Sequence, residues 1–96
     1  MNIPSDHEED AAELVYRRAG DETPAEGVVG AVSELTGTPP ETMDPLFDAI
    51  DPGALNTLCG RDPRTQKRTP RSVSFQFHGC AVAVYGDGRI EVSRLQ

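Results

Sequence analysis

Apolar and polar residues alternate along the last third of the chain with a period of two, which is the pattern of half-buried β-strands. Two such runs flank the dipeptide His78-Gly79, and a two-residue turn there is typical of a β-hairpin. This turn places every apolar residue of both runs on one face, because it pairs Phe77 with Cys80, Phe75 with Val82 and Val73 with Val84.

The length of the following turn is decided in the same way. A two-residue Asp87-Gly88 loop would set Val84 opposite Glu91, whereas a three-residue loop over 86–88 sets Val84 opposite Ile90. We therefore predict the longer loop, with Gly88 left-handed in a bulge. The result is an antiparallel meander with strands over 72–78, 80–85 and 89–94, one of whose faces is apolar.

The first half of the chain predicts three helices and one strand. Thr23-Pro24-Ala25-Glu26 is a capping box with proline at the first helical position, and a stripe of apolar residues continues the helix to Gly37 (Val28, Val32 and Leu35). Asp44-Pro45 and Asp51-Pro52 each place a capping acid before proline, which predicts helices over 45–50 and 52–59. Their expected anchors are Leu46, Phe47 and Ile50 in the first and Leu55 and Leu58 in the second. Residues 13–18 are β-prone and predict a strand.

These elements predict an α+β fold: a small antiparallel sheet, made of the N-terminal strand and the C-terminal three-stranded meander, with helices packed on one face. Residues 1–11 are expected to form a disordered acidic tail, and residues 12–96 a single domain. The chain begins with polar and acidic residues and has no apolar run near the roughly 20 residues of a membrane span, so we expect a cytoplasmic protein.

Charge is plentiful and uneven. The chain has 16 acidic and nine basic residues, a net charge of −7, and Lys67 is its only lysine. An acidic, lysine-poor composition is typical of proteins that work at very high salt, although an ordinary acidic protein is the simpler alternative. Residues 1–51 carry 13 acids and two bases (−11), and residues 52–96 carry three acids and seven bases (+4). This asymmetry suggests complementary contacts within the chain or with a partner.

Two segments of the chain form a recognisable pattern together. The first, residues 45–58, reads Pro-Leu-Phe-Asp-Ala-Ile-Asp-Pro-Gly-Ala-Leu-Asn-Thr-Leu, and the second is the hairpin pair 73–92 with its Gly-Asp-Gly-Arg ending. With these two segments the chain resembles the halobacterial output domain, a small module of halophilic archaea. The resemblance covers about residues 12–94. It implies an output module of signal transduction that acts beside sensor, receiver or regulator proteins, and it supplies no catalytic residue to carry over. Cys80, where the family commonly has an aromatic residue, and the long basic segment 61–71 depart from the family pattern.

The outer face of the predicted sheet is our candidate partner surface, formed by Ser74, Gln76, Ala81, Ala83 and Tyr85. These side chains are small or flat, and the edge strand of the meander is a second place where a partner could bind. We expect a protein partner and no membrane contact, and a homodimer remains open. The alternative is a small DNA-associated transcriptional regulator that contacts phosphates through a basic loop, residues 61–71, with Arg61, Arg64, Lys67, Arg68 and Arg71.

Other reactive side chains are better explained by structure. His78, Cys59 and Cys80 lack the paired spacing of a zinc site, and both cysteines fit as small buried apolar residues. His78 and Cys80 would point in different directions, so they do not form a nucleophile and base. Asp87 and Glu91 lack the run of oxygen ligands that calcium needs. We therefore expect no catalytic residue, cofactor or metal site, and a protein that is not an enzyme.

Overall fold

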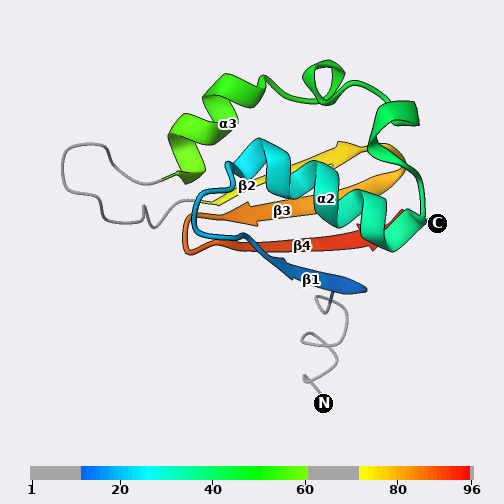
Figure 1. Ribbon diagram of the computed structural model, residues 1–96, viewed down its shortest axis with the longest axis horizontal. Helices are drawn as coiled ribbons and strands as arrows, with labels where there is room; N and C mark the ends of the chain where they lie inside the picture. Colours follow the sequence, from blue (N-terminus) through cyan, green and yellow to red (C-terminus); the bar gives the residue numbers. More distant parts are fainter. Residues whose placement is uncertain (1–11, 61–71, 96) are drawn as a thin grey trace, which may run out of the picture.

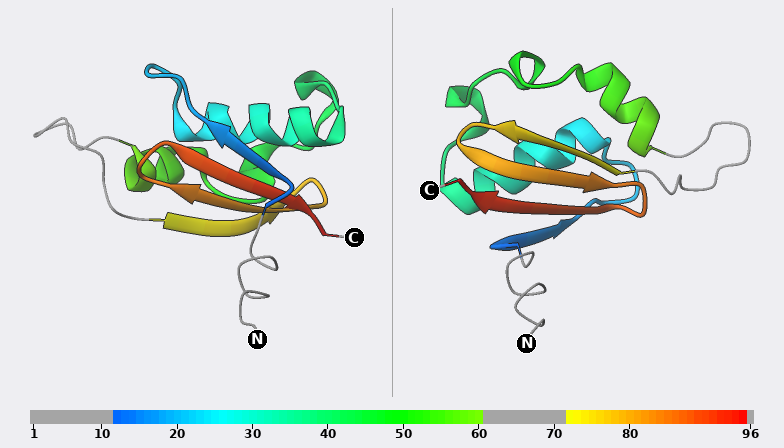
Figure 2. Two further views of the ribbon diagram at one scale, coloured as in Figure 1. Left: turned by 90° about the horizontal axis from the view of Figure 1, so that it is seen from below. Right: turned by 180° about the vertical axis from the view of Figure 1, so that it is seen from behind.

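The computed structural model describes residues 12–60 and 72–95, and within them it forms an α+β fold of two layers. The expected N-terminal tail and the basic loop 61–71 lie outside the described residues. Four antiparallel strands form one sheet in the order β1-β4-β3-β2, and the helices cover one of its faces (Figures 1 and 2). The predicted fold class is confirmed. The elements in chain order are β1 (Leu14–Arg17), α2 (Pro24–Thr36), α3 (Pro52–Cys59), β2 (Ser72–Phe77), β3 (Cys80–Tyr85) and β4 (Arg89–Arg94).

The meander has the predicted register throughout. β2 pairs with β3 as Phe77 to Cys80, Phe75 to Val82 and Val73 to Val84, and β3 pairs with β4 as Val84 to Ile90 and Val82 to Val92. The first turn is tight because two successive residues have positive φ, His78 at 51° and Gly79 at 75°. Gly88 is also left-handed, with φ of 98°, as the three-residue loop requires.

β1 is the edge strand on the side of the sheet away from β2. It pairs with β4, and Leu14 and Tyr16 lie opposite Val92 and Ile90. Because these four residues share a face, β1 adds Leu14 and Tyr16 to the apolar side that the helices cover.

α2 begins and ends as predicted. Thr23 Oγ1 accepts a hydrogen bond from the Glu26 amide (3.1 Å), and Glu26 Oε1 accepts one from the Thr23 amide (2.9 Å), which completes the capping box. Gly37 ends the helix in the left-handed conformation, with φ of 75°. Val28 and Val32 are fully buried against the sheet and Leu35 is partly buried, so the apolar stripe packs toward the core.

The predicted helix over 45–50 is wrong. The chain forms a single 3₁₀ turn, Leu46–Asp48, that begins after an extended Pro45 and has no side-chain cap. An α-helix does not start here, because the carboxylate of Asp44 contacts His78 instead of capping the next amides, and Pro45 is extended, with ψ of 132°. Leu46 is buried as expected, but Phe47 anchors nothing and remains 69% exposed.

The second Asp-Pro pair does start a helix. Asp51 Oδ1 accepts hydrogen bonds from the amides of Gly53 (2.9 Å) and Ala54 (3.4 Å), and α3 then continues to Cys59. Leu55 is fully buried and Leu58 is partly buried. The core lies between this helical layer and the sheet; Val73 and Phe75, at the β2 edge of the apolar face, are only partly buried.

Candidate functional site

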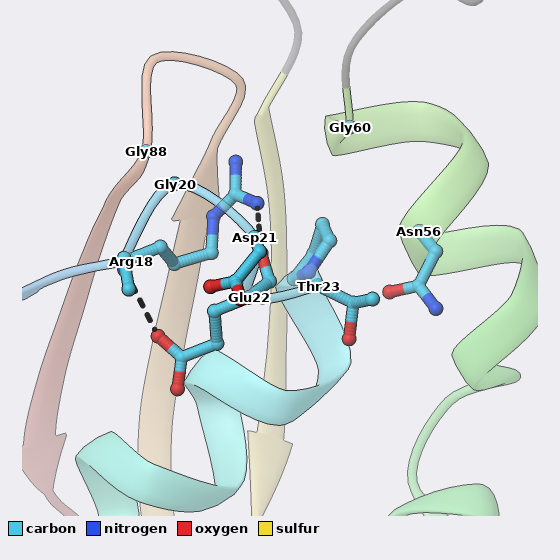
Figure 3. Close-up of a pocket in the computed structure, with 10 residues that line it drawn as sticks. Arg18, Gly20, Asp21, Glu22, Thr23, Asn56, Gly60 and Gly88 are labelled. Carbon is cyan, nitrogen blue, oxygen red and sulfur yellow. Dashed lines mark hydrogen bonds between the residues drawn. The ribbon is translucent and has the colours of Figure 1, made fainter.

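A polar hollow of about 260 Å³ opens where the turn after β1 meets the two helices (Figure 3). Arg18 crosses it: Nη1 donates to the carbonyl oxygen of Glu22 (3.0 Å) and Nη2 donates to that of Cys59 (3.2 Å). On the other side Asn56 reaches from α3, and its Oδ1 accepts a hydrogen bond from the Ala25 amide (2.9 Å). The hollow therefore lies among groups that join β1, α2 and α3.

These contacts use the groups that would otherwise bind a ligand. The amides of Ala25 and Glu26, the second and third residues of α2, donate to Asn56 and Thr23, so the start of this helix is already capped. The guanidinium of Arg18 lies at the C-terminal end of α3, where the helix dipole favours a positive charge. We assign this hollow a structural role.

Arg18 was not among the site residues predicted from the sequence, although the sequence holds a signal for it. Arg18 follows Leu14 and Tyr16 at a spacing of two residues, and this parity places a side chain on the helix side of the sheet. A charged residue at the end of such a run is expected to bind polar backbone groups there. The same region holds Tyr16, whose hydroxyl donates to Glu22 Oε2 at 2.8 Å, and this bond raises the pKa of Tyr16.

The predicted partner surface is assembled by the sheet. All five of its residues lie on the face opposite the helices, since their neighbours along each strand point into the core. Ser74, Gln76 and Ala81 are exposed, and Ala83 and Tyr85 are partly exposed. Figure 2 shows this face free of any described helix. Whether a partner binds there stays a prediction.

β1 and β4 extend this outer face beyond the predicted residues. Val15, opposite Glu91, is 51% exposed. A shallow groove of about 480 Å³ runs across the strands, and its lining includes Ser74, Gln76, Ala81, Ala83, Glu91 and Ser93. The outer face is therefore a concave surface of small side chains with an exposed valine beside it.

A charged cluster borders the groove at the Tyr85 end. The guanidinium carbon of Arg89 lies 4.2 Å from the centre of the Tyr85 ring, and Arg89 Nη1 lies 3.6 Å from Glu91 Oε2. The Tyr85 hydroxyl is 3.5 Å from Glu91 Oε1, which links all three side chains. Arg89 and Glu91 were not predicted as members of this face, although their parity in the predicted meander places them there.

The structure also places the other candidate residues. Cys59 and Cys80 are fully buried free thiols, as predicted, and burial raises the pKa of both. His78 occupies its turn, and its Nδ1 lies 3.4 Å from Asp44 Oδ2, so Asp44 contacts the hairpin instead of capping a helix. Asp87 Oδ1 accepts a hydrogen bond from the Arg89 amide (3.0 Å) and shapes the second turn.

Within residues 12–60 and 72–95, no group of three or more histidine, cysteine, aspartate or glutamate side chains is placed to hold a metal ion. The phosphate-contacting residues of the DNA-binding alternative, Arg61, Arg64, Lys67, Arg68 and Arg71, all lie outside the described residues. That alternative stays a prediction.

The described helices are all too short or too polar to cross a membrane. No curated protein and no solved structure matches the chain. A family model does match, over residues 20–94, which is most of the chain and includes α2, α3 and the whole meander but not β1. Its description is Halobacterial output domain 1. The chain therefore belongs to the halobacterial output domain 1 family.

Proposed function

We propose that this domain is a non-catalytic output module of intracellular signal transduction, and that the outer sheet face binds its protein partner. The observation that carries the proposal is the one-sided packing of the sheet. The described helices cover one face, and the other face presents small side chains, an aromatic ring and an exposed valine. Such a surface lets a partner helix or strand approach closely, and Tyr85 offers a rigid amphipathic contact of the kind enriched in interfaces.

The chemistry of the remaining groups supports an interaction role. The polar groups of the hollow beside Arg18 bind one another across three elements. The two thiols are held in their protonated form by burial, which disfavours the thiolate that a nucleophile needs. The family is described as an output domain, which supports a role in signalling. We propose that its partner is a sensor, receiver or regulator protein.

The test compares two surfaces of the same protein. The tagged domain is used to capture partners from a lysate of a halophilic archaeon in molar KCl, and the captured protein is then purified and titrated against Tyr85→Glu and Ala81→Glu variants. We expect both variants to bind at least about 10-fold more weakly, because each brings an unpaired carboxylate into the contact. Thr42→Glu, at an exposed position on the helical side, is the matched control. Equal affinity for all four proteins would refute the proposed surface.

A further inference from the structure

One edge strand of the sheet lacks the features that usually prevent an edge from pairing with a strand of another chain. β2 lies at the end of the strand order and has a described strand, β3, on one side only. Its six residues, Ser-Val-Ser-Phe-Gln-Phe, include no charged residue and no proline. Natural edge strands are commonly short, charged or interrupted by proline. The opposite edge follows this rule, because β1 has four residues and carries an exposed Arg17.

The helix beside this strand is uncharged as well. α3 packs against β2, and Figure 1 shows it along that side of the molecule. Neither Pro52–Cys59 nor Ser72–Phe77 contains an aspartate, glutamate, lysine or arginine, in a chain that is 26% charged. We call these two elements the β2–α3 flank. Its exposed residues are Gly53, Ala54, Thr57, Ser72, Ser74 and Gln76.

The charge distribution favours a second copy of the chain as the occupant of this flank. The net charge is −7, and exposed acids extend over α2 and the segment that follows it (Glu26, Glu34, Glu41, Asp44 and Asp48). Contact between two copies through those acids would remove water from carboxylates and bring like charges together, and both changes are costly. β2 and α3 themselves carry no charge, and the carboxylates next to them, Asp51 at the start of α3 and Asp44 beside His78 after β2, stand at their ends. Two acidic copies that meet along these two elements therefore bring fewer like charges together.

We propose that two copies of the chain pair through antiparallel β2 strands and form one continuous eight-stranded sheet. The apolar face must stay continuous, so residues that face each other need the same parity. A register with Ser74 opposite Ser74 meets this condition and sets Val73 of each copy against Phe75 of the other. Both residues are only partly buried in the single chain, although they lie on the core face. Pairing therefore covers the apolar side chains that one copy leaves half open.

The test introduces a charged side chain at Ser74, which lies on the twofold axis of the proposed dimer. Light scattering across a range of protein concentrations is expected to show twice the 10.4-kDa mass of one chain for the wild-type protein. Ser74→Lys and Ser74→Glu each place like charges opposite one another and are expected to weaken the dimer about 100-fold or more. An equimolar mixture of the two variants should restore it as a heterodimer. Measurements belong at the lowest KCl concentration that keeps the chain folded, because the screening length falls to about 3 Å at 1 M salt.

Matched controls separate this edge from the outer face. Ala81→Lys and Ala81→Glu change an exposed residue of β3 on the same outer face as Ser74, and they are expected to leave the dimer intact. Circular dichroism checks that every variant is folded. A wild-type monomer at all concentrations would overturn the proposal, as would a dimer that Ala81 variants break and Ser74 variants do not. This inference does not rest on the proposed function, since the partner titration with Tyr85→Glu can succeed or fail independently.

Discussion

α2 lies close to the sheet at Gly27, and replacing this residue by alanine tests the packing of the two layers. A Cβ atom at Gly27 would lie 2.6 Å from Ile90 Cδ1 and 2.8 Å from Arg18 Cγ. Neither neighbour can move away easily. Ile90 is fully buried, and the guanidinium of Arg18 is held by its bonds to Glu22 and Cys59.

Two opposing effects set the magnitude for Gly27→Ala. Alanine in a helix interior is favoured over glycine by about 1 kcal/mol. Forcing an extra methyl group into a packed core costs about 1–3 kcal/mol, and contacts below 3 Å on two sides place this site at the upper end. We therefore expect a net loss of about 1–2 kcal/mol in the free energy of unfolding. For a domain of this size the loss corresponds to a fall in Tm of roughly 5–10 °C.

The assay is urea and thermal unfolding followed by circular dichroism, with Gly53→Ala as the matched control. Gly53 is exposed in the first turn of α3, and its nearest contact for a new Cβ is Asp51 Oδ1 at 3.4 Å, so this change should be neutral or stabilising. Ile90→Val removes the Cδ1 atom, and combined with Gly27→Ala it should cost about 1 kcal/mol less than the sum of the single changes. If Gly27→Ala stabilises the protein as Gly53→Ala does, the close approach of α2 to β4 is refuted.

Three further predictions concern the polar hollow and the thiols. Arg18→Lys should lower the free energy of unfolding by about 2 kcal/mol, since one ammonium group cannot reproduce the two carbonyl contacts; an unchanged urea midpoint would contradict this. The pKa of Tyr16 is raised by its bond to Glu22, so the folded chain keeps a proton that the unfolded chain releases. Its contribution to stability is complete below about pH 10 and is lost as the pH rises further, and Tyr16→Phe should flatten that decline in pH-dependent unfolding curves. Cys59 and Cys80 should resist a water-soluble thiol reagent at pH 8 until urea unfolds the chain, and rapid labelling of either one without urea would show that it is accessible.

The parts of the fold that could be predicted are those in which local pattern and turn chemistry agree. The meander register followed from alternation and turn length alone, and the left-handed residues His78, Gly79 and Gly88 lie where those turns need them. The capping box of α2 is equally local, because all its groups lie within four residues. Such signals survive in the folded chain because no tertiary contact opposes them.

The parts that could not be predicted depend on contacts between distant segments. Asp44 precedes a proline as Asp51 does, yet it lies beside His78 while Asp51 caps α3. Nothing near Phe47 in the sequence shows that Leu46 would be buried in the core while Phe47 stays exposed. The candidate surface shows the same division: parity placed Tyr85 on the outer face, but the grouping of Tyr85, Arg89 and Glu91 depends on how the strands are arranged in space.

The pairing of β1 with β4 has a consequence for how the chain is made. The Arg94 amide donates to Glu13 Oε1 at 2.7 Å, a bond between residues 81 positions apart. During synthesis β1 and α2 leave the ribosome well before their partner β4, because α3, β2 and β3 lie between them in the chain. In the nascent chain Leu14, Tyr16 and the apolar stripe of α2 therefore stay without their native contacts to β4 until β4 itself has been translated. The acidic residues concentrated in the first half of the sequence would help to keep this exposed apolar segment from aggregating.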